Sequence, residues 1–104
     1  YKTPALVNLD WTTTFPLGGQ RKDVDLGLAL ARQHEVPMPI TAAVREMFQA
    51  HFGVAKTKPN PDAYLAQDFA TLFETMALIA GVKLESENVQ VSDGLEPEGA
   101  PARA

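Results

Sequence analysis

Lys22 occupies a position where the pattern of apolar residues predicts a hydrocarbon side chain. We expect a helix over residues 15–34, and on its projection Lys22 lies within about 40° of Phe15, Leu26 and Ala29. A lysine at such a position can cover apolar surface with its four-carbon stem while its ammonium group reaches water. Alternatively, it offers a fixed positive charge and hydrogen-bond donors to an anionic or polar partner from outside the helix. The position alone does not decide between these two interpretations.

Few other side chains could carry chemistry by themselves. The chain has no cysteine, which excludes disulfides, thiol nucleophiles and cysteine-based metal sites. His34 and His51 are the only histidines, and no carboxylates lie at spacings that would complete a zinc site, so we predict no metal site and interpret both as solvated or as capping helix ends. The only serines, Ser86 and Ser92, lie in a polar tail, which excludes a serine nucleophile inside the fold.

Length and charge narrow the class of protein. The 104 residues suffice for one domain, which at this size buries roughly 65% of the surface of the unfolded chain. Nine basic and 13 acidic residues give a net charge of -4 without a basic patch, so neither nucleic acid nor a membrane is an expected partner. No apolar run approaches the roughly 20 residues of a transmembrane helix, and no signal peptide is recognisable, so a cytoplasmic location is expected. Because the chain starts at Tyr1, we interpret it as part of a longer protein.

The helix over residues 15–34 carries two opposed apolar stripes. One stripe comprises Leu17, Val24, Leu28 and Ala31, and the other comprises Phe15, Leu26, Ala29 and Leu30. Burial on both sides is typical of a helix that runs through the middle of an all-helical domain. We expect Thr14 to be its N-cap and Arg21 to pair with Asp25. Glycines in a helix interior cost about 0.8–1 kcal/mol each relative to alanine, so Gly18, Gly19 and Gly27 predict either close backbone approach or, at Gly18-Gly19, a break.

The remaining segments predict two further helices. Prolines at 37 and 39 end the first helix, and a short amphipathic helix over residues 42–52 should follow Thr41 and stop at Gly53. After a proline-broken loop, in which residues 61–67 can form a short helical turn, Asp68 is expected to cap a last helix that ends at Gly81. The apolar stripe of this helix is interpreted as core or subunit interface and comprises Phe69, Leu72, Phe73, Met76, Ile79 and Ala80.

The two ends of the chain have a different composition. Residues 1–13 are interpreted as an extended lead-in, with Trp11 as a core or interface anchor. Residues 85–104 are acidic and poor in large apolar side chains, and we expect them to form a disordered tail. The sequence therefore predicts an all-α domain over residues 1–84.

Several of these features occur in an order typical of one enzyme family. Phe15-Pro16-Leu17, the run Lys22-Asp23-Val24-Asp25-Leu26-Gly27-Leu28-Ala29 and the turn Val36-Pro37-Met38-Pro39-Ile40-Thr41 resemble the C-terminal helical domain of the 3-hydroxyisobutyrate dehydrogenase family. These enzymes are 6-phosphogluconate dehydrogenase-like β-hydroxyacid dehydrogenases. Gly53 and Asp68-Phe69-Ala70 are similar to later features of the family pattern. Val24 replaces the usual leucine, and residues 55–67 are longer than the typical loop.

The resemblance implies a function for the whole enzyme. Family members oxidise a 3-hydroxy acid, or reduce the matching semialdehyde, with NAD or NADP. Their dinucleotide-binding domain and catalytic lysine would lie upstream of Tyr1, so no catalytic residue is expected in this chain, which should be inactive alone. The resemblance assigns Lys22 to the nicotinamide half of the cofactor, and Phe15 and Asp23 to the substrate pocket. It also implies a homo-oligomer.

A function of a different class stays open. A two-sided apolar helix without a complete active site also fits a stand-alone helical module that dimerises or binds another protein without catalysing a reaction. The sequence distinguishes neither NAD from NADP nor one hydroxy acid from another.

Overall fold

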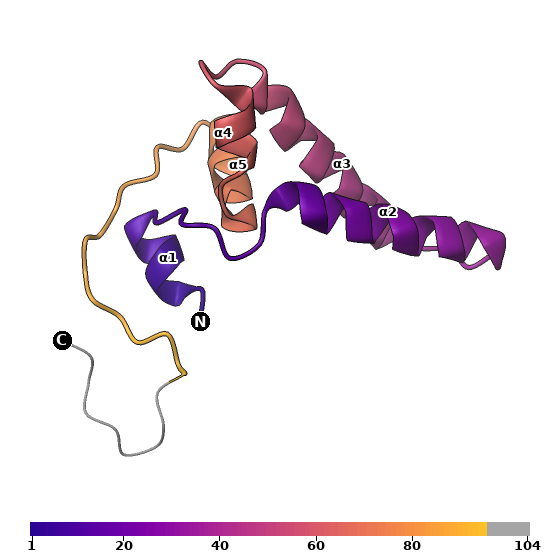
Figure 1. Cartoon of the computed structure of the whole chain (residues 1–104), viewed down its shortest axis with the longest axis horizontal. Coiled ribbons are helices and arrows are strands. Elements are labelled where there is room, and N and C mark those ends of the chain that lie inside the picture. Colours follow the sequence, from indigo (N-terminus) through magenta and orange to yellow (C-terminus); the bar gives the residue numbers. More distant parts are fainter. Residues whose placement is uncertain (96–104) are drawn as a thin grey trace.

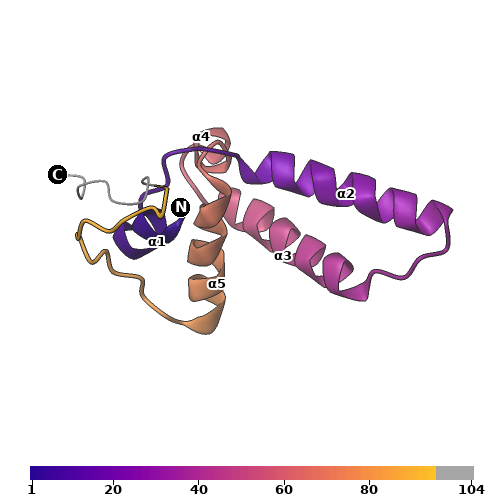
Figure 2. The ribbon, with the colours of Figure 1, turned by 90° about the horizontal axis from the view of Figure 1, so that it is seen from below.

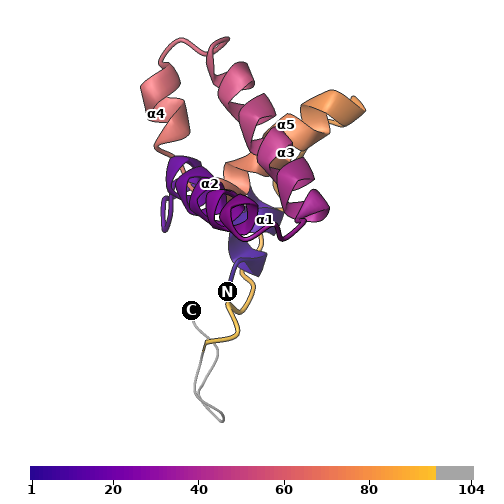
Figure 3. The same cartoon turned by 90° about the vertical axis from the view of Figure 1, so that its right-hand side faces the viewer.

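The computed structural model describes residues 1–95, and this part of the chain is all-helical, as the sequence predicts. Its elements are α1 (Thr3–Asn8), α2 (Leu17–Gln33), α3 (Pro39–Ala55), α4 (Pro61–Leu65), the 3₁₀ turn η1 (Phe69–Thr71) and α5 (Leu72–Ala80). The long helices α2 and α3 form an antiparallel pair, and α1, α4 and α5 gather at one end of it (Figure 1). Viewed nearly along α2, α3 and α4 lie to different sides of it (Figure 3). No helix among the described residues has the length and apolar character needed to cross a membrane.

Helix α2 buries only one of its two apolar stripes. Leu17, Leu28 and Ala31 are buried, whereas Leu26 and Leu30 are 61% and 58% exposed. The expectation that both sides would be buried is therefore wrong for this chain, because no described element covers the second stripe. The sequence pattern identifies which faces of a helix are apolar, but it does not say whether another element of the same chain packs on each of them.

One glycine of α2 is explained by a close approach. A Cβ atom at Gly19 would lie 2.6 Å from Cζ of Phe15, whereas at Gly27 it would meet nothing within 4 Å. At Gly18 the nearest atom, in the ring of Phe52, would be at an ordinary contact distance of 3.8 Å. The helix continues through Gly18-Gly19 without a break. The predicted close approach is thus found at Gly19, where a side-chain ring lies against the helix.

Helix α3 is longer than the sequence predicts at both ends. Pro39 is its first residue, a position where the missing N–H group has no partner to lose. Gly53 lies inside the helix and has no positive φ, so its predicted role as a left-handed C-cap is wrong. The helix continues because Ala55, one turn after His51, is buried on the same face. Burial of this last turn offsets the low helix propensity of glycine.

Helix α5 ends at Gly81 as predicted, with φ of 68°. Its buried residue is Thr75, which follows the buried Thr71 of η1 by one turn. The predicted apolar stripe is instead largely on the surface, since Phe73 is 48% and Ile79 66% exposed. The interpretation of this stripe as core is therefore wrong within the described chain, and its role as a subunit interface stays a prediction.

The terminal segments lie side by side. Residues 3–8 form the short helix α1, so the predicted extended lead-in is wrong there. Residues 82–95 have no regular secondary structure and run along α1 (Figure 2). The side-chain amide of Asn8 donates to the carbonyl of Val89 at 2.6 Å and accepts from its N–H at 2.8 Å. The predicted boundary near residue 84 and the predicted tail stay predictions, and residues 96–104 of that tail lie outside the described residues.

Candidate functional site

The three residues assigned by the family pattern lie at the start of α2. Phe15 is 39% exposed and precedes the helix by two residues, while Lys22 and Asp23 are exposed on its second turn. Within residues 1–95, the side chains of Lys22 and Asp23 make no hydrogen bond or ion pair. The ammonium group of Lys22 is therefore available to a partner from outside this chain.

The ring of Phe15 lies on the first turn of α2, against Gly19. Gly19 and Lys22 are three residues apart in the helix, so they lie on the same face. An aromatic ring and an ammonium group thus share one side of the helix start. Such a pair can cover an apolar part of a ligand and bind a neighbouring polar or anionic group.

A buried carboxylate fixes the backbone around Phe15. Oδ1 of Asp68 accepts hydrogen bonds from the N–H and the hydroxyl of Thr14, at 3.0 and 2.8 Å, and from the N–H of Phe15 at 3.2 Å. Oδ2 of Asp68 accepts from the ammonium of Lys2 at 2.7 Å and from the N–H of Ala70 at 3.0 Å. The prediction that Thr14 is the N-cap of α2 is wrong, because Pro16 occupies that position. We call this set of contacts the Asp68 clamp.

Backbone hydrogen bonds extend the clamp along residues 11–16, which we call the entry segment. The N–H of Asp68 donates to the carbonyl of Trp11 at 3.1 Å, and the N–H of Phe69 donates to the carbonyl of Phe15 at 2.8 Å. The half-buried indole of Trp11 donates to Glu74 on α5, which fits its predicted role as an anchor. The path of the chain into α2 is thus set by residues from the other end of the domain.

The surroundings of Asp68 keep it ionised. Burial by itself would raise the pKa of this carboxyl group. The hydrogen bonds from Lys2, from the N–H groups of Ala70 and Thr14 and from the Thr14 hydroxyl outweigh burial and hold the pKa well below its usual range. At neutral pH the clamp therefore contains a buried anion next to a mostly buried ammonium group.

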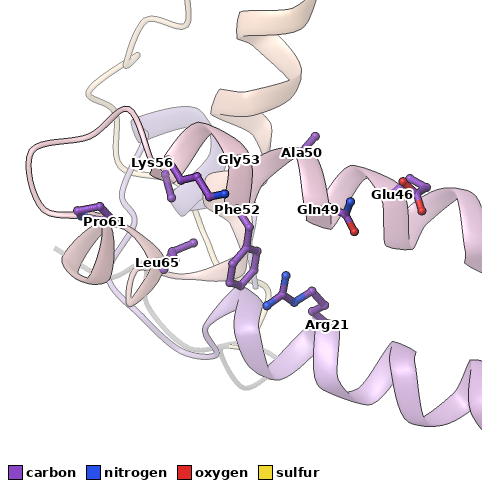
Figure 4. A pocket seen from close by; sticks show the side chains of 10 residues that line it. Arg21, Glu46, Gln49, Ala50, Phe52, Gly53, Lys56, Pro61 and Leu65 are labelled. Carbon is purple, nitrogen blue, oxygen red and sulfur yellow. The ribbon is translucent and has the colours of Figure 1, made fainter.

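A groove of about 770 Å³ opens between the start of α2, the end of α3 and α4 (Figure 4). Arg21 and Lys56 reach it from α2 and from the end of α3, and Phe52 lies between them (Figure 4). The guanidinium carbon of Arg21 is 3.5 Å from the centre of the Phe52 ring. None of the three residues assigned by the family pattern lines this groove.

The ion pair predicted between neighbouring turns of α2 is replaced by one between helices. Asp25 accepts from Nε of Arg45 on α3 at 2.6 Å, while Arg21 stacks on an aromatic ring instead. The predicted pair of Arg21 and Asp25 is therefore wrong, because each of the two residues finds a partner on α3. Helix α3 thus contacts α2 both at Arg21, which lines the groove, and at Asp25, which forms the ion pair.

His51 is the centre of a second buried polar cluster. It is 1% exposed, and its Nδ1 lies 2.7 Å from the hydroxyl of Thr75. Its ring stacks on Tyr64, whose hydroxyl donates to Glu74 at 3.3 Å. Burial lowers the pKa of His51, and burial together with Glu74 raises the pKa of Tyr64 to about 12.

The interpretation of His51 as solvated or capping is wrong. Its spacing from Phe48 and Ala55, three and four residues away, places it on the buried face of α3 and would have indicated burial. His34, in contrast, is exposed and ends α2, as expected. The described residues contain no group of three or more side chains arranged to hold a metal ion.

The comparison with protein families identifies the family of this chain. Residues 2–63, more than half of the chain, match the model of the family described as NAD-binding of NADP-dependent 3-hydroxyisobutyrate dehydrogenase. The chain belongs to this family. The family predicted from the order of the motifs is confirmed, and so is a nicotinamide cofactor, NAD or NADP. A search among curated proteins gave no match.

The matched region contains α1, α2, α3 and the start of α4. It therefore includes Phe15, Lys22 and Asp23, but it ends before Asp68. Sequence reasoning identified Asp68 as a helix cap and as part of a later feature of the family pattern. Its role as a cap is confirmed by its bond to the N–H of Ala70. Its link to Lys2 and to the entry segment was missed, because partners this far apart leave no local pattern.

Proposed function

We propose that this chain is the C-terminal helical domain of a dehydrogenase that oxidises a 3-hydroxy acid, or reduces the matching semialdehyde, with NAD or NADP. Family membership supports the dehydrogenase class and the cofactor. The finer proposal rests on the exposed Lys22, which has no ion-pair partner among residues 1–95. Lys22 lies on the same helix face as Gly19, and the Phe15 ring lies against Gly19. A domain of this kind completes a site that lies between domains.

The residues at the start of α2 fit a nicotinamide cofactor and a small hydroxy acid. When bound, the nicotinamide ring accepts or returns a hydride. In this proposal Lys22 donates hydrogen bonds to polar groups on the nicotinamide half of the cofactor. Phe15 covers the carbon skeleton of the substrate, and Asp23 accepts hydrogen bonds near its polar end. The general acid/base would be a lysine outside this chain, so the chain by itself would be inactive.

The exposed apolar faces support further parts of the proposal. Leu26 and Leu30 on α2, and Phe73 and Ile79 on α5, are exposed here and would be covered by the dinucleotide-binding domain or by a second copy. We accordingly propose that the protein forms a homo-oligomer. We also propose that it is located in the cytoplasm. The net charge of -4 fits the absence of nucleic acid and anionic membranes among its partners.

Kinetics of the natural dehydrogenase that contains this chain test the proposal. Hydrogen bonds to a charged group are worth about 1.5–3 kcal/mol, so Lys22→Ala should raise the KM for the cofactor about 10–100-fold. Arg32→Ala, which removes an exposed cation from the last turn of the same helix, is the matched control and should leave this KM unchanged. A normal cofactor KM in Lys22→Ala would contradict the role of Lys22. Failure to oxidise any of a series of short 3-hydroxy acids would contradict the proposed activity.

A second candidate function is a stand-alone helical module for dimerisation or protein interaction, without catalytic activity. The exposed apolar stripe of α5 favours it. Cofactor binding separates the two functions. Titration of the natural protein with NADH and NADPH should show saturable binding if it is a dehydrogenase, and no heat of binding if it is only an interaction module.

A further inference from the structure

The Asp68 clamp joins three separate segments at one carboxylate. We propose that Asp68 is a positioning residue for the substrate side of the site, because it fixes the backbone that carries the Phe15 ring. This inference rests on the proposed substrate role of Phe15. It adds a function for Asp68 and Lys2, to which the resemblance assigns no role in the site.

Asp68 holds the backbone of the entry segment next to Phe15. Thr14 and Phe15 precede α2, so their N–H groups have no partner inside a helix. Both donate to the same oxygen, Oδ1 of Asp68, at 3.0 and 3.2 Å. One oxygen thus determines the orientation of two successive peptide groups immediately before the ring.

Both backbone polar groups of Phe15 are hydrogen-bonded. Its N–H is held by Asp68 and its carbonyl accepts from the N–H of the next residue, Phe69, at 2.8 Å. With both backbone groups fixed, the remaining freedom of Phe15 lies in its side-chain torsions. Gly19 lets the ring lie against α2, because any larger residue would place a Cβ atom 2.6 Å from the ring. The location of the ring is therefore set by the clamp together with one glycine.

The negative charge of Asp68 is balanced by the ammonium group of Lys2. The side chain of Asp68 is fully buried and that of Lys2 is 20% exposed, so the anion is compensated mainly by this ammonium group at 2.7 Å. Lys2 also donates to the hydroxyl of Thr14 at 2.8 Å and lies 4.7 Å from the centre of the Phe69 ring. Lys2 thus contacts the same two segments that Asp68 connects. Removing Lys2 should loosen the clamp without removing the acceptor.

The kinetic test uses the natural dehydrogenase and separates two Michaelis constants. Asp68→Asn keeps the shape of the side chain but removes its charge and one acceptor oxygen. Because a misplaced Phe15 weakens substrate contacts, the KM for the 3-hydroxy acid should rise about tenfold, while the cofactor KM changes less than about twofold. Lys2→Met should shift the substrate KM in the same direction by a smaller factor.

Glu74→Gln is the matched control. Glu74 accepts hydrogen bonds from Trp11 of the entry segment and from Tyr64, but not from Thr14 or Phe15. This variant should lower Tm and leave both Michaelis constants at wild-type values. If Asp68→Asn merely lowers Tm in the same way, with no selective rise of the substrate KM, Asp68 is a structural residue only and the inference is overturned.

A second measurement needs neither cofactor nor substrate. In the 104-residue chain, the ring current of Phe15 should displace the proton NMR signals of Gly19 relative to those in a Phe15→Leu variant. Asp68→Asn should move these signals toward the Phe15→Leu positions, whereas Glu74→Gln should leave them at wild-type positions. Unchanged Gly19 signals in Asp68→Asn would show that the clamp does not position the ring. If the wild-type enzyme oxidises no 3-hydroxy acid, the proposed function fails, while the NMR result still decides whether Asp68 positions Phe15.

Discussion

The two ends of the α2–α3 pair are held by different interactions. At the end near α4 and α5, buried polar groups such as Asp68 and His51 bind partners from other elements. At the far end, where residues 34–38 connect the two helices, apolar side chains including Leu30 and Ile40 are exposed. Hydrogen bonds between distant segments fix the positions of the bonded atoms to within a few tenths of an ångström. A partly covered apolar face does not fix individual atoms in this way and instead offers a surface for contact.

The difference corresponds to the proposed roles of the two ends. Phe15 and Lys22, which would bind substrate and cofactor, lie at the end where geometry is determined by buried polar contacts. The far end, like the exposed side of α5, presents apolar side chains, and in the proposed function another domain or subunit covers them. Substitutions of comparable residues at the two ends therefore test whether the ends differ in this way.

The largest expected effect separates two leucines of α2. Leu17 at the near end is buried, so Leu17→Ala should lower the free energy of unfolding by about 2–5 kcal/mol. Leu30 at the far end is exposed, so Leu30→Ala should change it by no more than about 0.5 kcal/mol. Urea denaturation of both variants of the 104-residue chain provides the measurement. A comparable loss in Leu30→Ala would show that the far end is covered in solution, for instance by a second copy.

An intermediate effect is expected from the buried histidine. Burial lowers the pKa of His51 from its ordinary 6.5, so the unfolded chain binds the proton more readily than the folded one. Its contribution to stability is complete above pH 6.5 and is lost as the pH falls toward the lower, folded-state pKa, at no more than about 1.4 kcal/mol per pH unit. His51→Gln should flatten the pH dependence of the free energy of unfolding just below pH 6.5. His34→Gln, at an exposed histidine, should retain it, and a flat profile in wild type would contradict the prediction.

The smallest effect distinguishes two glycines of the same helix. Gly27→Ala adds a methyl group that meets nothing within 4 Å, so it should raise the free energy of unfolding by about 0.8–1 kcal/mol through helix propensity. Gly19→Ala has the same gain in propensity, but its methyl group requires the Phe15 ring to move. It should therefore stabilise the chain less than Gly27→Ala and raise the substrate KM of the natural enzyme. Equal stabilisation with an unchanged KM would show that the ring position does not matter.

Local patterns predicted the framework of the fold. The buried stripe of α2 and the end of α5 at Gly81 follow from helical spacing and from the backbone freedom of glycine. The same rules failed at Gly53, where a buried residue after the glycine extends the helix, and at α1, where the chain lies beside residues 82–95. These failures have one cause, because tertiary packing overrides local preference where distant segments meet.

The candidate site was predictable only in part. Phe15, Lys22 and Asp23 were identified by their order within a family pattern, and their roles stay proposals. The carboxylate that holds Phe15 could not be read from the sequence, since Asp68 lies 53 residues beyond Phe15 and no spacing rule connects them. The burial of His51 was predictable from its helical position but was overlooked because histidine is polar.

The distances along the chain between the partners in the clamp determine when it can form during synthesis. The α2–α3 pair can close as soon as residue 55 is available, since its contacts join residues that are closer in sequence, such as Asp25 and Arg45, which are 20 residues apart. The entry segment, by contrast, must wait for Asp68, which is 54 residues beyond Thr14, and Asn8 must wait for Val89, 81 residues further on. A ribosome-bound chain would thus present a formed helix pair with a Phe15 ring that is not yet fixed. The clamp next to the proposed site can therefore close only after residue 70 has been made.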